Sequence, residues 1–319
     1  MKRFLTVSIC MLALFAGVAG CGSDDPESAA TPEERVSVFE QGETNPLFKE
    51  EKVPNYLPHM SWFEIEEALL RTDMVIIPTG SIEQHGKHLP LCTDIYAAIE
   101  LCKLIAQETD VIIAPSVFAG LSEHHMGFPG TLTFTPATYE AVLYETAQSL
   151  IHHGFDKIMI YNGHGGNKVS VANVIEKINQ ETSATAVFLN NISVPADPDR
   201  ENIPYDFHAG EGETSSMLYL AGSLVNMSRA ERPVLTFSQV VQDAEAMLDE
   251  EPNLNLVISA NRFRPRDAGK AASSREMSNI GVFTSGDPKN AEAEKGKKNA
   301  ERFVNAAVKF IEAWKQLSR

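Results

Sequence analysis

The sequence has few cysteines, few tryptophans and a shortage of basic residues. Only 4 of its 319 residues are cysteines, which excludes a disulfide scaffold at this length. Lys and Arg number 27 against 43 Asp and Glu, giving a formal net charge of −16 at pH 7. A surface this acidic repels phosphate backbones, and we see no basic block, so no nucleic acid partner is expected. With 43% hydrophobic and 22% charged residues, the chain has an ordinary globular composition rather than a collagen-like, disordered or multi-span membrane one.

One long apolar run stands at the start of the chain, in residues 4–19, after two basic residues. It is about as long as a signal-peptide core and shorter than the roughly 20 apolar residues that a stable membrane span needs. Three small residues close it directly before Cys21, a pattern that resembles the lipobox of bacterial lipoproteins, in which the cysteine is lipidated. The alternative is an ordinary signal peptide in which Cys21 is incidental.

The lipobox predicts how the chain is organised and where it resides. We expect a lipoprotein signal peptide in residues 1–20, and lipidated Cys21 with a solvated flexible tether in residues 21–50. Acyl chains would hold the protein in the bacterial cell envelope without a spanning helix. Residue 22 is Gly rather than Asp, which favours the outer membrane, facing the periplasm or the cell surface. The mature chain then keeps two further cysteines, Cys92 and Cys102, which either form a disulfide or pack as separate thiols.

Strands and helices alternate through the body of the chain, which predicts one α/β domain with a mostly parallel sheet and helices on both faces. Short apolar runs typical of buried strands occupy residues 74–78, 111–114, 157–161 and 185–189. Helical stretches occupy residues 95–108, 136–153, 167–181 and 290–317. In such sheets the ligand crevice lies at the carboxyl ends of the strands, so the loops there are where function is expected.

Carboxylates and imidazoles occur in the loops that follow these strands. Glu83 and His85 alternate after the first strand, so in extended backbone their side chains share one face. Asp94 stands at the start of the next helix, where its carboxylate could also serve as a cap. His164 follows the third strand between glycines, which let the backbone approach a ligand closely.

A further loop contains His208, Glu211 and Glu213 and opens another helix. Because these loops meet at one edge of the sheet, their oxygen and nitrogen donors should converge, a set that suits Zn, Mn or Fe(II) better than Ca or Mg. Burying Glu83, Asp94 and Glu213 together without a cation would be costly, since close like charges cannot all ionise. The sequence therefore predicts a site for one divalent ion, or for two bridged by a carboxylate.

Four separated motifs occur in the chain: GSIEQHGKHLPL at 80–91, FPGT at 128–131, NGHGGN at 162–167 and HAGEGETS at 208–215. Together they resemble the motifs of the creatininase (creatinine amidohydrolase) family, over a stretch from about residue 62 to the final helix. The resemblance implies a three-layer α/β/α sandwich, often in hexamers, with a two-metal site that hydrolyses non-peptide or cyclic C–N amide bonds. Residues 51–319 are thus expected to form a creatininase-like metal-dependent hydrolase domain, with a small-molecule amide as substrate and a second copy of the chain as partner.

The resemblance also implies roles for single residues. Glu83 and His164 match ligands of one ion, and His85 matches a ligand of the other. Asp94 matches the carboxylate that bridges the two ions, and His208 matches the catalytic histidine.

The sequence departs from creatininase itself at two places. There, a glutamate after the loop histidine is a metal ligand, whereas residues 165–166 of this chain are both glycine. We expect Glu213 to fill that place, with Glu211 as the second choice. The creatininase pocket also uses tryptophans before the catalytic histidine, and this chain has only Trp62 and Trp314, far away in sequence. Creatinine is therefore a poor candidate, and the Gly-His-Gly-Gly form instead resembles relatives that act on formamides or peptide-like amides.

The expected reaction uses two divalent ions, zinc first and manganese or iron as alternatives, which lower the pKa of a shared water from about 15.7 toward 7. That water attacks the amide carbonyl, and His208 shuttles a proton to the departing nitrogen. The alternative is a non-catalytic surface lipoprotein that binds a metal or a solute, which would lack an open coordination position. Residues expected to line the pocket, to support the ligands or merely to pack the loops are His88, Ser122, His124, His125 and Glu211.

Overall fold

The computed structural model describes residues 45, 50–198, 203, 206–261 and 273–317. The chain divides into a unit of residues 1–51 and a unit of residues 52–319. In the first unit only Asn45, Glu50 and Glu51 are described, and all three are exposed. The expected signal peptide, Cys21 and most of the expected tether therefore lie outside the described residues. In the described part of the chain, no helix is both long enough and apolar enough to cross a membrane.

The second unit contains a parallel sheet of four strands in the order β2-β1-β3-β4. All four strands fall on the predicted apolar runs, and every residue of β1 is buried. Their bounds are β1 Met74–Thr79, β2 Ile112–Ile113, β3 Lys157–Asn162 and β4 Thr185–Phe188.

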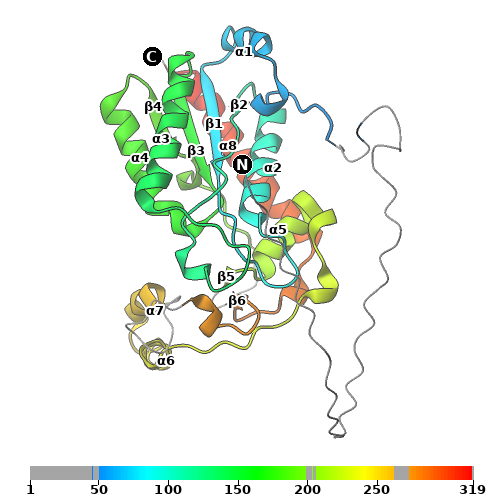
Figure 1. Ribbon diagram of the computed structural model, residues 1–319, viewed down its shortest axis with the longest axis vertical. Coiled ribbons are helices and arrows are strands. Elements are labelled where there is room, and N and C mark those ends of the chain that lie inside the picture. Colours follow the sequence, from blue (N-terminus) through cyan, green and yellow to red (C-terminus); the bar gives the residue numbers. More distant parts are fainter. Residues whose placement is uncertain (1–44, 46–49, 199–202, 204–205, 262–272, 318–319) are drawn as a thin grey trace, which may run out of the picture. The chain divides into compact units, whose positions relative to one another are not determined.

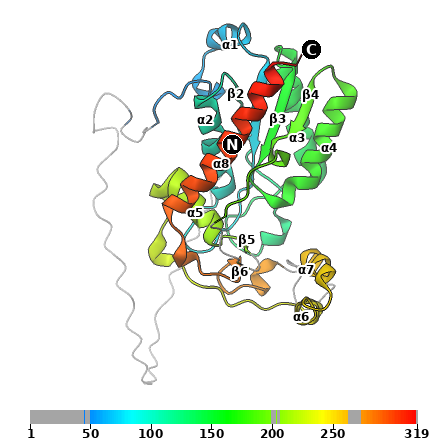
Figure 2. The ribbon, with the colours of Figure 1, turned by 180° about the vertical axis from the view of Figure 1, so that it is seen from behind.

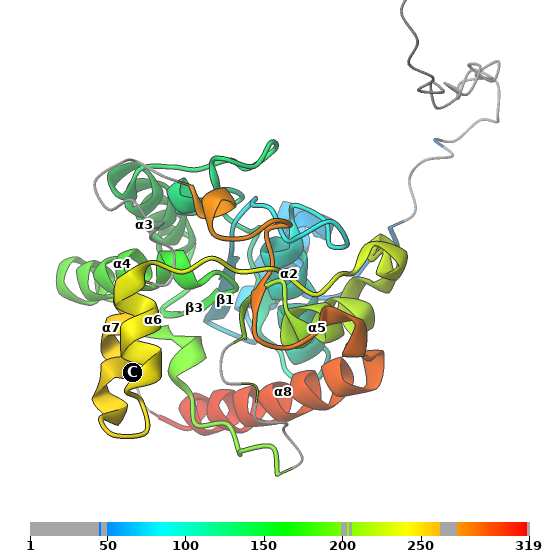
Figure 3. The same cartoon turned by 90° about the horizontal axis from the view of Figure 1, so that it is seen from below.

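Helices cover both faces of this sheet, which confirms the predicted three-layer α/β/α fold. On one face lie α3 (Pro136–His152) and α4 (Lys168–Glu181), and on the other lie α2 (Thr93–Gln107) and α8 (Ala293–Lys315). Figure 1 shows the first pair beside the strands. Figure 2, in which the molecule is seen from behind, shows α8 running across the front of the strands, and Figure 3 shows β1 and β3 between the two layers.

The strand pattern explains this layering. Side chains alternate along a strand, so Val75 and Ile77 pack into the core under α3 and α4, while Met74 and Ile76 pack into the core under α2 and α8. Burial on both faces gives an apolar run without polar alternation, as the sequence has in β1.

The remaining elements gather mostly at the carboxyl end of the sheet (Figure 1). Two short strands, β5 and β6, pair antiparallel there, and α5 follows β5 and packs on α2 and α8. The two cysteines that the structure describes, Cys92 and Cys102, are free thiols. The bounds of these elements are α1 Trp62–Leu69, β5 Asp206–His208, α5 Glu211–Ala221, α6 Gln239–Ala246, α7 Asn255–Asn261 and β6 Phe283–Thr284.

Candidate metal centre

The five residues expected to hold metal come from four separate segments and meet at the carboxyl end of the sheet. Glu83 and His85 lie in the loop after β1, Asp94 in the first turn of α2, His164 after β3, and Glu213 in the first turn of α5. Four of them are buried, and Glu213 is partly exposed. The structure thus brings together all five predicted positions.

Asp94 lies between the two predicted ligand histidines. Its Oδ1 is 3.0 Å from His85 Nε2 and its Oδ2 is 3.2 Å from His164 Nδ1. The residue that caps α2 is Cys92, and the Asp94 carboxylate turns instead toward the two imidazoles. Within the described residues, the buried Oδ2 has no hydrogen-bond partner. An orphaned buried carboxylate oxygen is costly unless a cation or a proton lies beside it.

Both ligand histidines are held by a backbone carbonyl at their outer nitrogen. His85 Nδ1 is 3.0 Å from the Glu83 carbonyl, and His164 Nε2 is 3.2 Å from the Leu121 carbonyl. Because a carbonyl only accepts, these outer nitrogens carry the hydrogen and leave the inner nitrogens free in the neutral rings. This is the arrangement in which metal-bound histidines are usually held.

Each inner nitrogen faces two carboxylates. His85 Nε2 lies 3.0 Å from Asp94 and 3.7 Å from Glu213, and His164 Nδ1 lies 3.3 Å from Glu83 and 3.2 Å from Asp94. Burial by itself would lower the pKa of His85, but the Asp94 carboxylate and its acidic neighbours raise it to about 9. Without a metal, a proton therefore takes the place between imidazole and carboxylate that a cation would occupy.

The donor set fits divalent metal ions. Three clusters of side chains have ligand atoms that lie within 4.8 Å of one another. Imidazole nitrogens with carboxylate oxygens suit Zn, Mn or Fe(II). The clusters are Glu83, His124 and His164; Glu83, His85 and His208; and His85, Asp94 and Glu213.

The two glutamates at the start of α5 face different partners. Glu213 turns to the cluster, where its Oε2 accepts a hydrogen bond of 2.6 Å from the Ala209 amide. Desolvation raises the pKa of Glu213 to about 7, and the neighbouring Asp94 and Glu83 charges act in the same direction. Glu211 instead forms an ion pair of 2.7 Å with Lys295 of α8. The geometry therefore favours Glu213 over Glu211 as the additional carboxylate.

Ser122 supports Glu83 rather than facing open space. The Ser122 hydroxyl is fully buried, donates to Glu83 Oε2 and is itself hydrogen-bonded to Ser81. This leaves Glu83 Oε1 to face three imidazoles: His164 Nδ1 at 3.3 Å, His208 Nδ1 at 3.4 Å and His125 Nε2 at 3.7 Å.

The other predicted histidines differ in their distance from the cluster. His125 is fully buried and packs its ring 4.4 Å from that of His208, whereas His124 is partly exposed. His88 lies outside the cluster, with its Nε2 2.9 Å from Thr214 Oγ1 of α5. Burial, together with the charge of His85, lowers the pKa of His88 to about 4. His88 thus packs as a neutral ring between the loop and α5.

Glycine next to His164 serves packing within the site. A Cβ at Gly163 would lie 2.5 Å from the Asp94 carbonyl, so only glycine lets the loop after β3 come this close to α2. The sequence suggested that these glycines make room for a ligand, but Gly163 makes room for the backbone of α2.

A cavity of about 250 Å³ opens onto the cluster. Glu83, Asp94, His164, His208 and Glu213 all line it, and His124 and His125 lie at its wall. No tryptophan is among its described lining residues. Sequence reasoning missed Asp206 and Phe207, which also line it, and Gln84, which contacts His208. The position of Gln84 between two predicted ligands was the signal available.

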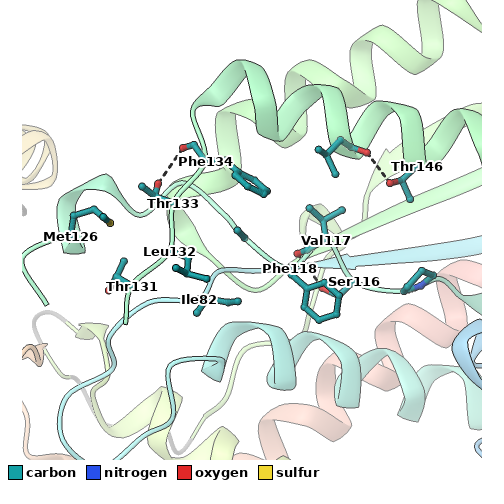
Figure 4. Close-up of a pocket in the computed structure, with 13 residues that line it drawn as sticks. Ile82, Ser116, Val117, Phe118, Met126, Thr131, Leu132, Thr133, Phe134 and Thr146 are labelled. Atoms are coloured by element: carbon teal, nitrogen blue, oxygen red, sulfur yellow. Dashed lines mark hydrogen bonds between the residues drawn. The ribbon is translucent and has the colours of Figure 1, made fainter. Parts of the chain in front are cut away.

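A larger groove of about 660 Å³ is lined by Ile82, the residue directly before Glu83 in the loop after β1 (Figure 4). Ile82 pairs with Leu132 there, and Phe118, Phe134 and Val142 supply more apolar surface. None of its described lining residues also lines the smaller cavity.

Comparison with known proteins agrees with this geometry. Residues 58–311 match the family described as "Creatininase: Creatinine amidohydrolase". The mycofactocin precursor peptide peptidase of Mycolicibacterium smegmatis is 30% identical over 247 residues, which cover 76% of this chain and 85% of the relative. The creatinine amidohydrolase of Pseudomonas putida is 27% identical over 203 residues, which cover 57% of this chain and 78% of the relative. A solved manganese form of creatininase shares the fold, with a TM-score of 0.62 and 21% identity over 82% of this chain and 98% of its own. This chain therefore belongs to the creatininase family.

Proposed function

We propose that this protein is a divalent-metal-dependent amidohydrolase that cleaves a C–N bond in a small non-peptide or cyclic amide. One observation carries the proposal. His85 and His164 each bind a backbone carbonyl through the outer ring nitrogen. The inner nitrogen of each ring faces carboxylates, and Asp94 is one of them in both cases. Two rings oriented in this way around one carboxylate are suited to a pair of ions.

Five residues would hold the two ions, zinc first and manganese or iron as alternatives. Glu83 and His164 would bind one ion, His85 and Glu213 the other, and Asp94 would bridge them. When bound, such ions activate a water and polarise a carbonyl oxygen. Ser122 keeps the Glu83 carboxylate in its orientation through the hydroxyl hydrogen bond.

His208 is proposed to move the proton. Its ring is buried at the cavity wall, and its Nδ1 is the nitrogen that faces the cluster, 3.4 Å from Glu83 Oε1. A nitrogen at this place can pass a proton to a departing amine, a role worth about 10²–10⁴ in rate.

The cavity supports a small substrate. Pockets for drug-sized ligands have volumes of about 300–1,000 Å³, and this cavity has about 250 Å³. A single amide group with a compact substituent fits such a space. The named relatives act on creatinine and on a precursor peptide, so a short peptide end is the second candidate.

The test is metal analysis of purified protein followed by an amide panel. The protein loaded with Zn, Mn or Fe(II) is offered lactams, formamides, creatinine and short peptides, and release of amine is measured. We expect about two ions per chain and turnover of a lactam or a formamide. Turnover of peptides alone would move the substrate class to peptide ends. Metal without turnover of any amide would favour the non-catalytic metal-binding alternative.

We also propose that the protein is a homo-oligomer anchored in the cell envelope through Cys21, with the membrane contacted only by the lipid. The apolar run at residues 4–19 and the small residues before Cys21 support the anchor, and family resemblance supports a hexamer. Expression of the full chain with labelled palmitate should label the protein and not the Cys21→Ser variant. Native mass measurement of residues 52–319 tests the hexamer.

A further inference from the structure

Gln84 lies between two predicted ligands and contacts two histidines that are not among them. It is buried, and its backbone carbonyl and side-chain amide both point into the site. These contacts determine which ring nitrogen of His208 and of His125 carries the hydrogen.

Two backbone groups fix the orientation of the Gln84 amide. The Gly86 amide donates to Gln84 Oε1 at 3.0 Å, and Gln84 Nε2 donates to the Gly281 carbonyl at 2.8 Å. If the amide oxygen and nitrogen were exchanged, two donors would face each other at the Gly86 contact and two acceptors at the Gly281 contact. Gly281 has a φ of +78°, and a Cβ there would lie 1.9 Å from Gln84 Oε1. Glycine is therefore required for this contact.

The Gln84 backbone fixes His208. His208 Nε2 is 2.5 Å from the Gln84 carbonyl oxygen, which only accepts. Nε2 therefore carries the hydrogen, and Nδ1, which faces Glu83 Oε1 at 3.4 Å, has a free lone pair in the neutral ring. Two acceptors facing each other in a buried site leave a place for a proton, a water or a cation between them.

The Gln84 side chain fixes His125. For the second hydrogen of Gln84 Nε2, two ring nitrogens lie within reach: His208 Nε2 is 2.9 Å from Gln84 Nε2, and His125 Nδ1 is 3.2 Å from it. His208 Nε2 is itself a donor and cannot accept this hydrogen. It therefore goes to His125 Nδ1, which also lies 2.6 Å from the Ser274 hydroxyl. His125 then carries its hydrogen on Nε2, the atom 3.7 Å from Glu83 Oε1.

The contacts themselves determine how many hydrogens each ring has to place. A hydrogen bond from Gln84 Nε2 to His125 Nδ1 needs a lone pair on that nitrogen, so His125 carries one hydrogen. In the neutral form of His208, the single hydrogen lies on Nε2 against the Gln84 carbonyl.

We propose that Gln84 is a positioning residue that fixes the hydrogens of both histidines, so that His208 offers a free Nδ1 and His125 an N–H to the same Glu83 oxygen. The consequence for His208 rests on the proposed function, because only a free Nδ1 can accept the proton of the reaction. The tautomers themselves do not depend on the reaction.

The test is ¹⁵N NMR of histidine-labelled, metal-free protein, which reports the tautomer of each ring. In the wild type we expect His208 and His125 both as neutral Nε2–H forms near pH 7. A charged ring or an Nδ1–H form at either residue would overturn the proposal. Metal content and the amide panel, both measured on the untreated wild type, test the proposed function separately, since this spectrum requires no metal and no substrate.

Gln84→Glu keeps the side-chain length and replaces the amide donor by an oxygen. We expect His125 to change to the Nδ1–H form, while His208 keeps Nε2–H because its partner is backbone. Gln107→Glu, an exposed position in α2, is the matched control and should change neither ring. If Gln84→Glu does not fold, Gln84→Met should leave His125 exchanging between two forms. An unchanged His125 in a folded variant would contradict the role of the side chain.

Activity provides a second measurement. In the metal-loaded Gln84→Met protein, His208 keeps its hydrogen on Nε2, but His125 no longer offers a fixed N–H to the Glu83 oxygen that His208 Nδ1 also faces. We therefore expect turnover to fall about 10–100-fold, as for groups that orient the reactive residues, with metal content unchanged. Wild-type turnover in this variant would overturn the positioning role.

Discussion

The two hollows, the groove lined by Ile82 and the cavity lined by Glu83, differ in size, in polarity and in the exposure of their linings. The larger, about 660 Å³, is lined by apolar side chains and open to solvent, with Phe118 64% and Leu132 54% exposed. The smaller, about 250 Å³, is lined by carboxylates and imidazoles, most of them buried. Size and apolarity alone point to the larger hollow. Buried charge is far more costly to place than exposed apolar surface, so its presence in the smaller hollow is the stronger sign of function.

The largest expected effect is that of Asp94→Asn, which keeps the side-chain shape and removes the charge shared by His85 and His164. We expect metal affinity to fall more than about 100-fold, because the variant removes a ligand outright rather than a supporting group. No amide turnover should be detectable. Isothermal titration with zinc gives the affinity. Asp110→Asn, an exposed carboxylate, is the control and should bind metal as the wild type does. If Asp94→Asn bound metal as tightly as the wild type, the smaller hollow would lose its advantage over the larger one as the candidate functional site.

His208→Ala should separate binding from catalysis within the smaller hollow. We expect metal content to stay near that of the wild type and turnover to fall about 10²–10⁴-fold, the range for a lost proton-transfer group. Metal analysis and a rate assay on the substrate found by the amide panel measure the two quantities. Loss of metal along with turnover would instead make His208 Nδ1 a ligand.

Glu213→Gln and Glu211→Gln compare neighbouring positions on α5. The first should weaken zinc binding by about 10–100-fold, because one carboxylate beside His85 loses its charge. The second breaks the ion pair between the buried Glu211 and Lys295 and should lower the free energy of unfolding by about 1–3 kcal/mol, with zinc binding unchanged. Zinc titration and thermal unfolding distinguish them. The reverse result would exchange the roles of the two glutamates.

Substitution in the larger hollow should have the smallest effect. Phe118→Ser removes an exposed aromatic, so we expect the free energy of unfolding to change by about 0.5 kcal/mol or less and metal content to stay the same. Turnover of the amide substrate should match that of the wild type. A raised KM in this variant would show that the groove takes part in substrate binding.

Much of the fold could be predicted because burial on two faces leaves a simple record in the sequence. The apolar runs at β1 and β3 and the helical stretches between them were assigned nearly to their ends. The short pair β5 and β6 was not predicted, because strands of two or three residues, one of which ends at His208, carry too little pattern to detect.

The candidate site could be predicted in part. Glu83 and His85 alternate after a strand, and the rule that ligands gather at the carboxyl ends of parallel strands placed them with His164. The sequence ranked Glu213 before Glu211, but the ion pair that holds Glu211 joins it to Lys295, far along the chain, so that contact could not be predicted.

The sequence by itself determined the alternation of strand and helix and the residue types that converge at one edge, because hydrophobic periodicity and the order of elements can be read from residues that are neighbours along the chain. Only the tertiary structure decided which nitrogen of each imidazole faces the carboxylates and what holds the other nitrogen. Those choices depend on backbone carbonyls of Glu83, Gln84 and Leu121, which every residue has, and only the folded chain brings them within hydrogen-bond distance.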